Sequence, residues 1–360
     1  MDDKSLKPIS IELLFGGMTV RDDIYDADYK QMLVKGGTAL TANTIKSIRR
    51  LNADRETIYV SPYVYRELVG ETLPCEVVNR EKLEEKTGYA EVKSKTFELL
   101  TEMSQKETIQ QEKLCTVADE LSERLEIAEP SAITMLINAL APVDEYLQRH
   151  CVNLGLLNGL FGRWMGMSKK AVDNLVLIGL LHDCGKAMLP AAVLSAPRRL
   201  SAVEYEVVKM HPVYTYNLLT EFSESVRHPA SSHHERMDGT GYPNKLAHAK
   251  IPREARITAI TDVYDAVVSQ RAYKTPRSPF SVMAMLNELS GTELDAELVG
   301  IFNTNMAQQL IGKPVAMSDG TFGVVRSCDP KDIEHPTVEI AGIMVKSSKN
   351  LYCTSMYTED

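Results

Sequence analysis

The spacing of apolar residues predicts a mainly helical chain. From Val92 to Leu125, apolar residues recur at intervals of mostly three and four, the period of a helix that buries one face. From about 131 to 306 the helical pattern continues between prolines, and several of the spans between them suit helices of about 10 to 20 residues. We therefore expect a helical bundle as the core of the protein.

The two ends of the chain have different patterns. Residues 1 to about 70 contain strand-like runs, one of them at 56–60, and a helix predicted from the N-cap Thr41 to Leu51. The tail has β-branched runs and a hairpin-turn signal at Asp319-Gly320. We expect four segments: a small α/β domain (1–70), a charged connector with a linker helix (71–130), a helical domain (131–306) and a small β-rich appendage (307–360).

Composition excludes several classes of protein. A net charge of −9 argues against extended binding to DNA or long RNA. No apolar run approaches the roughly 20 residues that cross a bilayer, and the N-terminus lacks the features of a secretion signal. The six cysteines form no C-x-x-C pair, as expected of free thiols in a reducing compartment. The sequence predicts a cytoplasmic protein without membrane insertion.

Histidine and aspartate mark the region of candidate chemistry. None of the eight histidines precedes His150, and His182-Asp183 directly follows an apolar run. Burying a carboxylate there without a partner costs roughly several kcal/mol, and a metal cation is one such partner. Asp262 and Asp265 share one face of an apolar helix. For these two, an ion pair with arginine or a bond to a helix N-terminus is an alternative to metal binding.

Three further sites add histidines. His233 and His234 precede the Gly- and Pro-rich loop 236–243, and loops on a helical scaffold often carry functional sites. His211 and His150 lie near predicted helix ends. Taken singly, His233 and His234 could instead be exposed side chains. His211 and His150 could instead be structural residues held by hydrogen bonds.

Together these positions predict a metal centre, because a helical bundle brings residues of successive helices to one place. Imidazole and carboxylate ligands without thiolate suit iron or manganese, and zinc less exclusively. The set is larger than the three or four ligands that one ion needs. We therefore expect at least two divalent ions, a pair suited to phosphoester hydrolysis. The candidate ligands are His150, His182, Asp183, His211, His233, His234 and Asp262.

Four motifs resemble the HD-GYP family of cyclic di-GMP phosphodiesterases. They are HDCGK at 182–186, HHERMDGTGYP at 233–243, TDVYDAVVSQRAYK at 261–274 and GTELDAELVGIF at 291–302, with His211-Pro212 between the first two. The resemblance covers about residues 145 to 305. It implies a helical HD-type bundle that opens cyclic di-GMP to linear pGpG by attack of a metal-bridging hydroxide on phosphorus, and it leaves open whether hydrolysis continues to GMP.

The resemblance also implies roles for individual residues. Asp183 and Lys186 would be catalytic, with Asp183 bridging two ions and Lys186 meeting the scissile phosphate. Arg271 and Lys274 would hold phosphates. One ion would be held by His150, His182, Asp183 and Asp262, and the other by His211, His233 and His234. Gly241, Tyr242 and Pro243 would shape the substrate-binding loop.

Some positions depart from the family pattern. Tyr146 stands where some members have a glutamate that binds a third metal, so we predict two ions of iron or manganese per chain. Thr215 stands where a glycine is usual.

Other functions stay open. One alternative is a catalytically weak signalling module that binds a cyclic dinucleotide. Another is a phosphodiesterase for a different cyclic dinucleotide such as cyclic GMP-AMP, because no residue distinguishes guanine from adenine. The helix predicted at 92–125 is a candidate surface for a homodimer.

Overall fold

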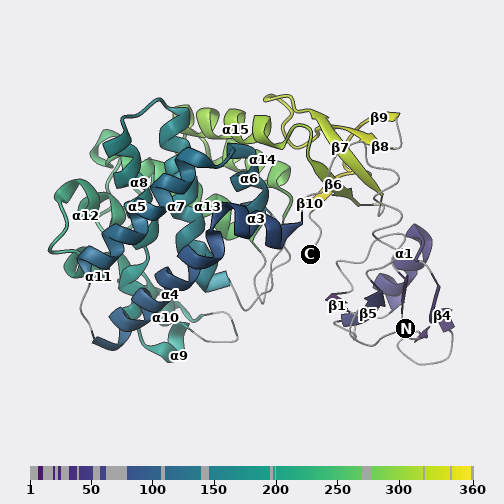
Figure 1. The fold of residues 1–360 in the computed structure, drawn as a ribbon, viewed down its shortest axis with the longest axis horizontal. Coiled ribbons are helices and arrows are strands. Elements are labelled where there is room, and N and C mark those ends of the chain that lie inside the picture. The colour runs from purple at the N-terminus through teal and green to yellow at the C-terminus, as the bar shows by residue number, and fades with distance from the viewer. Residues whose placement is uncertain are drawn as a thin grey trace. The chain divides into compact units, whose positions relative to one another are not determined.

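The fold is described from a computed structural model, in which two compact units can be told apart (Figure 1). One comprises residues 79–310, and the other comprises 1–78 together with 311–359. The residues whose structure is described are 7–10, 19–20, 23–25, 32–38, 40–51, 57–61, 79–106, 110–138, 146–194, 198, 200–269, 277–318, 321–340 and 343–357.

The unit of residues 79–310 is helical, as the sequence predicts. Its helices are α3 (Arg80–Thr87), α4 (Tyr89–Lys106), α5 (Gln111–Ile127), α6 (Pro130–Asn138), α7 (Tyr146–Trp164), α8 (Lys169–Leu181), α9 (Ala191–Leu194), α10 (Ala202–Val208), α11 (His211–Leu218), α12 (Glu224–Ala230), α13 (Arg253–Val268), α14 (Pro279–Leu289) and α15 (Ala296–Leu310), with short 3-10 turns η4 (Cys184–Met188) and η5 (His248–Lys250).

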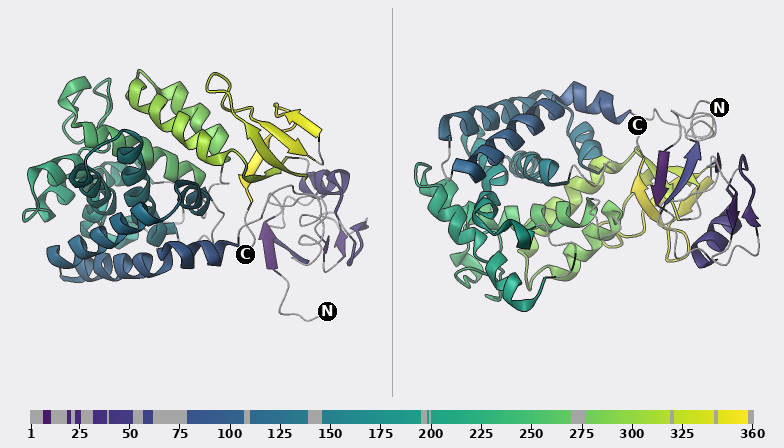
Figure 2. Two further views of the ribbon diagram at one scale, coloured as in Figure 1. Left: turned by 45° about the horizontal axis from the view of Figure 1, so that its top comes forward. Right: turned by 90° about the horizontal axis from the view of Figure 1, so that it is seen from below.

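The segment predicted as one helix from Val92 to Leu125 contains two helices. Helix α4 ends at Lys106 and α5 begins at Gln111, and Lys95 pairs with Glu120 across them. Both helices lie against α7 in each view (Figures 1 and 2). The apolar stripe of α5 is therefore already used inside this chain. Its members Leu114, Val117, Leu121 and Leu125 are all buried. The homodimer through this segment stays a prediction. Its interface would have to use side chains other than this buried stripe.

Helices α7 and α8 form the centre of the bundle because a glycine lets them approach closely. A Cβ atom on Gly179 would lie 2.5 Å from the backbone carbon of Leu154. The side chain of Asn158 in α7 then donates to the Leu175 carbonyl of α8 at 3.1 Å. It also accepts from Thr261 of α13 at 2.6 Å. These buried contacts fix the three helices that carry His150, His182 and Asp262.

Within its described residues, the second unit contains small antiparallel sheets and the helix α1. The predicted helix is confirmed as α1 (Ala42–Leu51), and the Thr41 hydroxyl accepts from the Thr44 amide as an N-cap does. The predicted strand at 56–60 is confirmed as β5 (Thr57–Ser61), which lies between β1 (Lys7–Ser10) and β2 (Thr19–Val20). Strand β3 (Ile24–Tyr25) pairs with β4 (Met32–Val34).

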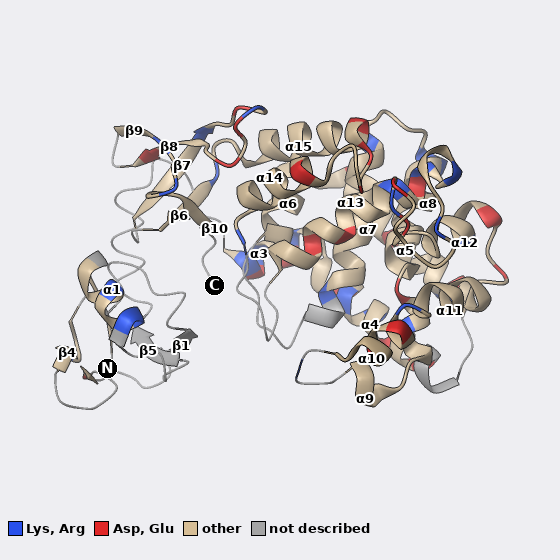
Figure 3. Ribbon diagram, turned by 180° about the vertical axis from the view of Figure 1, so that it is seen from behind, with Lys and Arg blue, Asp and Glu red and all other residues tan. Residues whose placement is uncertain are grey.

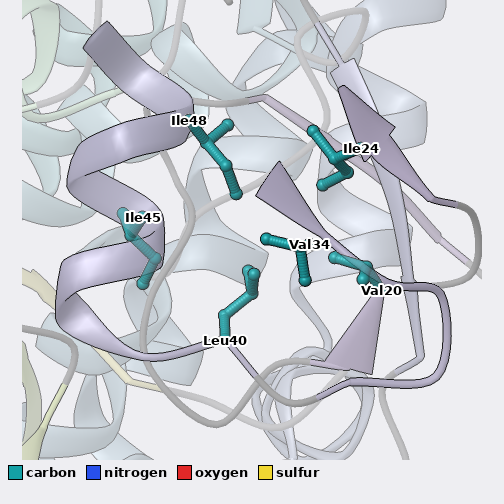
Figure 4. Packing of buried hydrophobic residues seen from close by; sticks show 6 residues of the cluster. All are labelled: Val20, Ile24, Val34, Leu40, Ile45 and Ile48. Atoms are coloured by element: carbon teal, nitrogen blue, oxygen red, sulfur yellow. The ribbon is translucent and has the colours of Figure 1, made fainter. Parts of the chain in front are cut away.

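Buried aliphatic side chains hold α1 against these strands. Figure 4 shows them facing one another from the helix and from the strand segments. The cluster consists of Val20, Ile24, Val34, Leu40, Ile45 and Ile48.

The C-terminal tail forms the predicted β structure. Its five strands pair antiparallel in the order β10-β6-β7-β8-β9. They are β6 (Pro314–Met317), β7 (Phe322–Ser327), β8 (Thr337–Ile340), β9 (Ile343–Lys346) and β10 (Cys353–Met356). The turn predicted at Asp319-Gly320 lies outside the described residues. The predicted fold class, mainly α with small mixed and β segments at the ends, is confirmed.

Charged residues of both signs are interspersed over the helices (Figure 3). Among the described residues, none of the helices combines the length and the apolar character that a membrane span requires.

Candidate metal centre

The side chains predicted as metal ligands lie together inside the helical unit. Five of the helices supply them at their ends or inner turns. His150 lies in α7, His182 caps the C-terminus of α8, Asp183 precedes η4, His211 begins α11, His233 and His234 follow α12, and Asp262 lies in α13. Residues more than a hundred positions apart in the sequence are thus brought into one group.

One half of the group consists of His150, His182 and Asp183. Their potential ligand atoms all lie within 4.8 Å of one another, and all three side chains are buried. The Nε2 atoms of His150 and His182 are 3.3 Å apart. Asp183 Oδ2 lies 3.3 Å from His182 Nε2 and 3.6 Å from His150 Nε2.

The other half consists of His211, His233, His234 and again Asp183. Here it is Asp183 Oδ1 that faces the imidazoles, at 3.3 Å from His211 Nε2 and 3.8 Å from His233 Nε2. The Nε2 atoms of His211 and His233 are 3.5 Å apart. The two oxygens of one carboxylate therefore face two different sets of histidines.

Asp262 lies beside both halves. Its Oδ1 is 3.4 Å from His150 Nε2, and its Oδ2 is 4.0 Å from His234 Nδ1. Lys186 also reaches the centre, where its Nζ atom lies 2.5 Å from Asp183 Oδ2. The remaining two predicted phosphate-binding residues, Arg271 and Lys274, lie outside the described residues.

Three of the imidazoles are oriented by their own backbone. The Nδ1 atoms of His182, His211 and His233 each lie 2.7 Å from the carbonyl oxygen three residues earlier in the chain. A carbonyl only accepts, so each Nδ1 carries the proton and donates. Each Nε2 then presents a lone pair to the centre, as in histidines that ligate metals.

A buried carboxylate orients the fourth imidazole. Asp265 Oδ2 accepts from His150 Nδ1 at 2.7 Å, and Asp265 Oδ1 accepts from the Asn153 amide at 2.7 Å. Asn153 Oδ1 in turn accepts from the Tyr89 hydroxyl of α4 at 2.6 Å. The sequence placed Asp265 on the face of Asp262 but gave it no place among the seven candidate ligands. Asn153 and Tyr89 gave no signal at all, because only the packing of α4 on α7 brings them there.

The spacing of the potential ligand atoms suits the binding of metal ions. The Nε2 atoms of His150 and His182 face each other at 3.3 Å, while the Nδ1 atom of each ring has an oxygen acceptor of its own, so both Nε2 atoms are placed to bind one cation. Two nitrogens bound to one metal at about 2.0–2.1 Å are separated by about 3.0–3.4 Å. Asp183 Oδ1, fully buried, accepts no hydrogen bond from the residues that the structure describes. A divalent cation in each half would satisfy these atoms.

The protonation states also suit cation binding. Burial opposes ionisation of the Asp183 carboxyl, but the charge of Lys186 and the adjacent imidazoles outweigh it and hold the pKa well below its usual range. The pKa of Asp262 is likewise lowered by neighbouring imidazoles in spite of burial. Burial lowers the pKa of His233 well below its usual value and that of His234 to about 3. The centre therefore offers ionised carboxylates and, at His233 and His234, neutral imidazoles, the forms that bind metals.

Gly185 and Thr215 bring η4 and α11 together at the centre. A Cβ atom on Gly185 would lie 2.1 Å from the carbonyl oxygen of His211. The Thr215 hydroxyl accepts from the Gly185 amide at 3.0 Å and lies 3.1 Å from the His182 carbonyl oxygen. The departure from glycine at position 215 thus adds contacts between the two segments that carry Asp183 and His211.

The loop after His234 folds back on the centre. Gly241 leaves no room for a side chain, because a Cβ atom there would lie 2.5 Å from the His234 carbonyl oxygen. The Tyr242 ring stacks on the His234 ring at 4.6 Å between centroids. The buried carboxylate of Glu235 holds the far side of the loop by accepting from the amides of Asn244 and Leu246 at 2.7 and 2.8 Å. Glu235 is a residue that sequence reasoning missed.

We expect Glu235→Gln to lower the free energy of unfolding by about 1–3 kcal/mol. A glutamine amide offers one oxygen, so one of the two loop amides loses its acceptor and faces a donor instead. Urea unfolding measures the change. Glu293→Gln is the matched control, because the Glu293 side chain is half-exposed and lies 3.7 Å from Arg236 in a long ion pair. Equal stabilities of the two variants would contradict the role given to Glu235.

The region that carries these residues is similar to known proteins. Residues 134–298 match the family model described as HD domain. The chain is 31% identical over 227 residues to Cyclic di-GMP phosphodiesterase PA4108 of Pseudomonas aeruginosa, which covers 62% of this chain and 54% of the relative. It is 32% identical over 190 residues to 3'3'-cGAMP-specific phosphodiesterase 1 of Vibrio cholerae, which covers 52% of this chain and 44% of the relative. The chain thus spans about half the length of these curated relatives.

A solved structure supports the fold. Bd1817, a HDG"Y"P protein from Bdellovibrio bacteriovorus, aligns with a TM-score of 0.51 at 14% identity over 84% of this chain and 99% of that chain. The resemblance to proteins of the HD-GYP type, which the four sequence motifs predicted, is confirmed.

Proposed function

We propose that this chain, whose residues 134–298 match the HD domain, is a metal-dependent phosphodiesterase that opens cyclic di-GMP to linear pGpG. One observation carries the proposal: Asp183 turns its two oxygens toward two separate sets of histidines. Such a carboxylate suits two cations that share a bridging ligand. Relatives named as phosphodiesterases of cyclic di-GMP and of 3'3'-cGAMP support the substrate class.

Two ions, of iron or manganese, are proposed for the centre. His150, His182 and Asp262 would hold one, the imidazoles of 211, 233 and 234 the other, and Asp183 would bind both. When bound, such ions activate water and neutralise charge on the phosphate. The proposed ligand atoms are all nitrogen or oxygen, without sulfur, which supports these metals. The position of Tyr146, where a third ion would need a carboxylate, supports a count of two.

The chain's own residues would orient the substrate and move its protons. Lys186 Nζ lies beside Asp183 Oδ2, where it would bind an oxygen of the scissile phosphate and donate a proton to the leaving 3′ oxygen. Tyr242 and Gly241 would border the bound ring on the side of His234. Arg271 and Lys274 would hold phosphates, a proposal that rests on their place in the motif alone.

The proposal is tested by purifying the protein without oxygen, loading it with Fe²⁺ or Mn²⁺, and separating the products from cyclic di-GMP and from 3'3'-cGAMP. Conversion of cyclic di-GMP to pGpG that stops on chelation is the expected result. Faster hydrolysis of 3'3'-cGAMP than of cyclic di-GMP would favour 3'3'-cGAMP as the substrate. Binding of cyclic di-GMP without turnover by the metal-loaded protein would contradict the proposed activity and favour a signalling module.

We expect Asp265→Asn to weaken metal binding by about 10–100-fold, the usual effect of removing a partner that orients a ligand. The introduced amide has a single acceptor oxygen, which could serve His150 or Asn153 but not both, so the His150 ring would lose its fixed orientation. Titration of the metal-free protein with Mn²⁺ measures the affinity. Asp173→Asn, a partly exposed carboxylate paired with Lys169 in α8, serves as the control. An affinity equal to that of the control would contradict this role.

A further inference from the structure

A row of aromatic rings and one ammonium group extends outward from the metal centre. Tyr242 stacks on His234, with an angle of 29° between the rings. The Nζ atom of Lys209 lies 5.8 Å from the centroid of the Tyr242 ring and 5.0 Å from that of Tyr205. Tyr205 is 48% exposed, so the row runs from the partly buried His234 to the surface.

Local structure fixes the outer members of this row. Helix α10 begins with a capping box in which Ser201 and Glu204 satisfy each other's backbone amides. Tyr205 and Lys209, four positions apart, therefore lie on one face. His211 follows two residues after Lys209, so the same short stretch carries both the outer residues and a histidine of the centre.

The contacts of Lys209 leave it able to bind an anion. Its ion pair with Glu206, at 2.7 Å, involves a carboxylate whose side chain is 70% exposed. Exposed ion pairs of this kind contribute little to stability, so a phosphate can take the place of Glu206 beside Lys209. By contrast, Arg236, also close to the centre, donates to the carbonyl oxygens of His233 and Glu235 within its own loop.

We propose that Tyr205 and Lys209 form a subsite for the half of a cyclic dinucleotide that is not being cleaved. The proposal rests on the proposed function, which places one phosphodiester at the metal centre. Such a substrate carries a second phosphate and two purine bases beyond that point. An ammonium group binds the phosphate, and an exposed tyrosine face stacks on a purine. Neither residue belongs to the motifs that suggested the centre.

The experiment compares two diesters and measures binding separately. Steady-state kinetics use cyclic di-GMP and bis(p-nitrophenyl) phosphate, a diester with neither purine nor second phosphate. Lys209→Met and Tyr205→Leu are expected to raise KM for cyclic di-GMP about tenfold, the size of one lost stacking or phosphate contact. KM for the small diester and metal content should stay unchanged. Tyr205→Phe, which keeps the ring, should behave as wild type, and Lys170→Met on the exposed start of α8 is the control.

Equilibrium dialysis with labelled cyclic di-GMP distinguishes the two proposals. Tenfold weaker binding by Lys209→Met and Tyr205→Leu supports the subsite whether or not the wild type turns over. Binding of cyclic di-GMP by the wild type without turnover contradicts the proposed function and leaves the subsite proposal standing. Equal binding by wild type and both variants, or equal rises in KM for both diesters, overturns the subsite. Failure of the metal-loaded wild type to bind cyclic di-GMP overturns both proposals.

Discussion

Asp183→Ala is expected to lower kcat/KM for cyclic di-GMP by at least about 10³-fold and to reduce bound metal in the same preparation. The reason is the position of its carboxylate, which faces His150 and His182 with one oxygen and His211 and His233 with the other. A residue that serves only one ion would leave the second in place. Loss of a residue shared by both should remove the activity and the metals together.

Elemental analysis and product chromatography on the same purified protein test this expectation. Asp173→Ala is the control, because Asp173 lies in the same helix that leads to Asp183 but is paired with a surface lysine. Circular dichroism checks that the variant is folded. An Asp183→Ala protein that keeps wild-type metal content and full turnover would show that this carboxylate bridges nothing.

Gly179→Ala is expected to lower the free energy of unfolding by about 1–3 kcal/mol, with a fall in Tm of roughly 2–10 °C for a unit of this size. A Cβ atom at this position would lie 2.5 Å from both the backbone carbon and the carbonyl oxygen of Leu154. Backbone atoms of α7 cannot rotate away as a flexible side chain would. The two helices must therefore separate.

Gly300→Ala gives the matched control for this experiment. It lies within α15, and a Cβ atom there would have no neighbour within 4 Å. Alanine in place of an open helical glycine is expected to stabilise by roughly 0.5–1 kcal/mol. Thermal unfolding followed by circular dichroism should therefore move the two variants in opposite directions. Similar shifts would mean that α7 and α8 are not locked by Gly179.

The sequence predicts the helical class well because its apolar spacing is local information. It could not separate α4 from α5, since an apolar period of three to four continues through both helices. The C-terminal tail was identified by its β-branched runs, and the N-terminal segment by strand-like runs and a helix N-cap. The packing partner of the apolar stripe of α5 depends on contacts between residues far apart in the sequence. Leu121 and Leu125 lie against glycines of α7, which no local pattern can indicate.

For the centre, the sequence supplied the candidate atoms but not their orientation. A histidine followed by an aspartate is visible in the chain, whereas the bond from His150 Nδ1 to Asp265 joins residues 115 positions apart. Glu235 was overlooked because a glutamate after two histidines looks like a surface residue. Its burial follows from the amides of Asn244 and Leu246, whose loop turns back onto it.

The arrangement of the centre explains why the candidates act as one group. Three imidazoles are held by carbonyls of their own helical turns, and the fourth is held by Asp265. Three of these orienting bonds are buried and the one of His211 is partly buried, so the rings keep their direction without help from substrate. The network from Tyr89 through Asn153 also connects α4 to His150. Movement of α4 along α7 would therefore disturb a residue of the centre directly.

Anomalous scattering from crystals of the Mn²⁺-loaded protein, measured at the manganese absorption edge, tests the central claim most directly. Two peaks are predicted, one near Asp183 Oδ2 among the imidazoles of His150 and His182, and one near Oδ1 among those of His211 and His233. A single peak, or peaks remote from this carboxylate, would contradict the account.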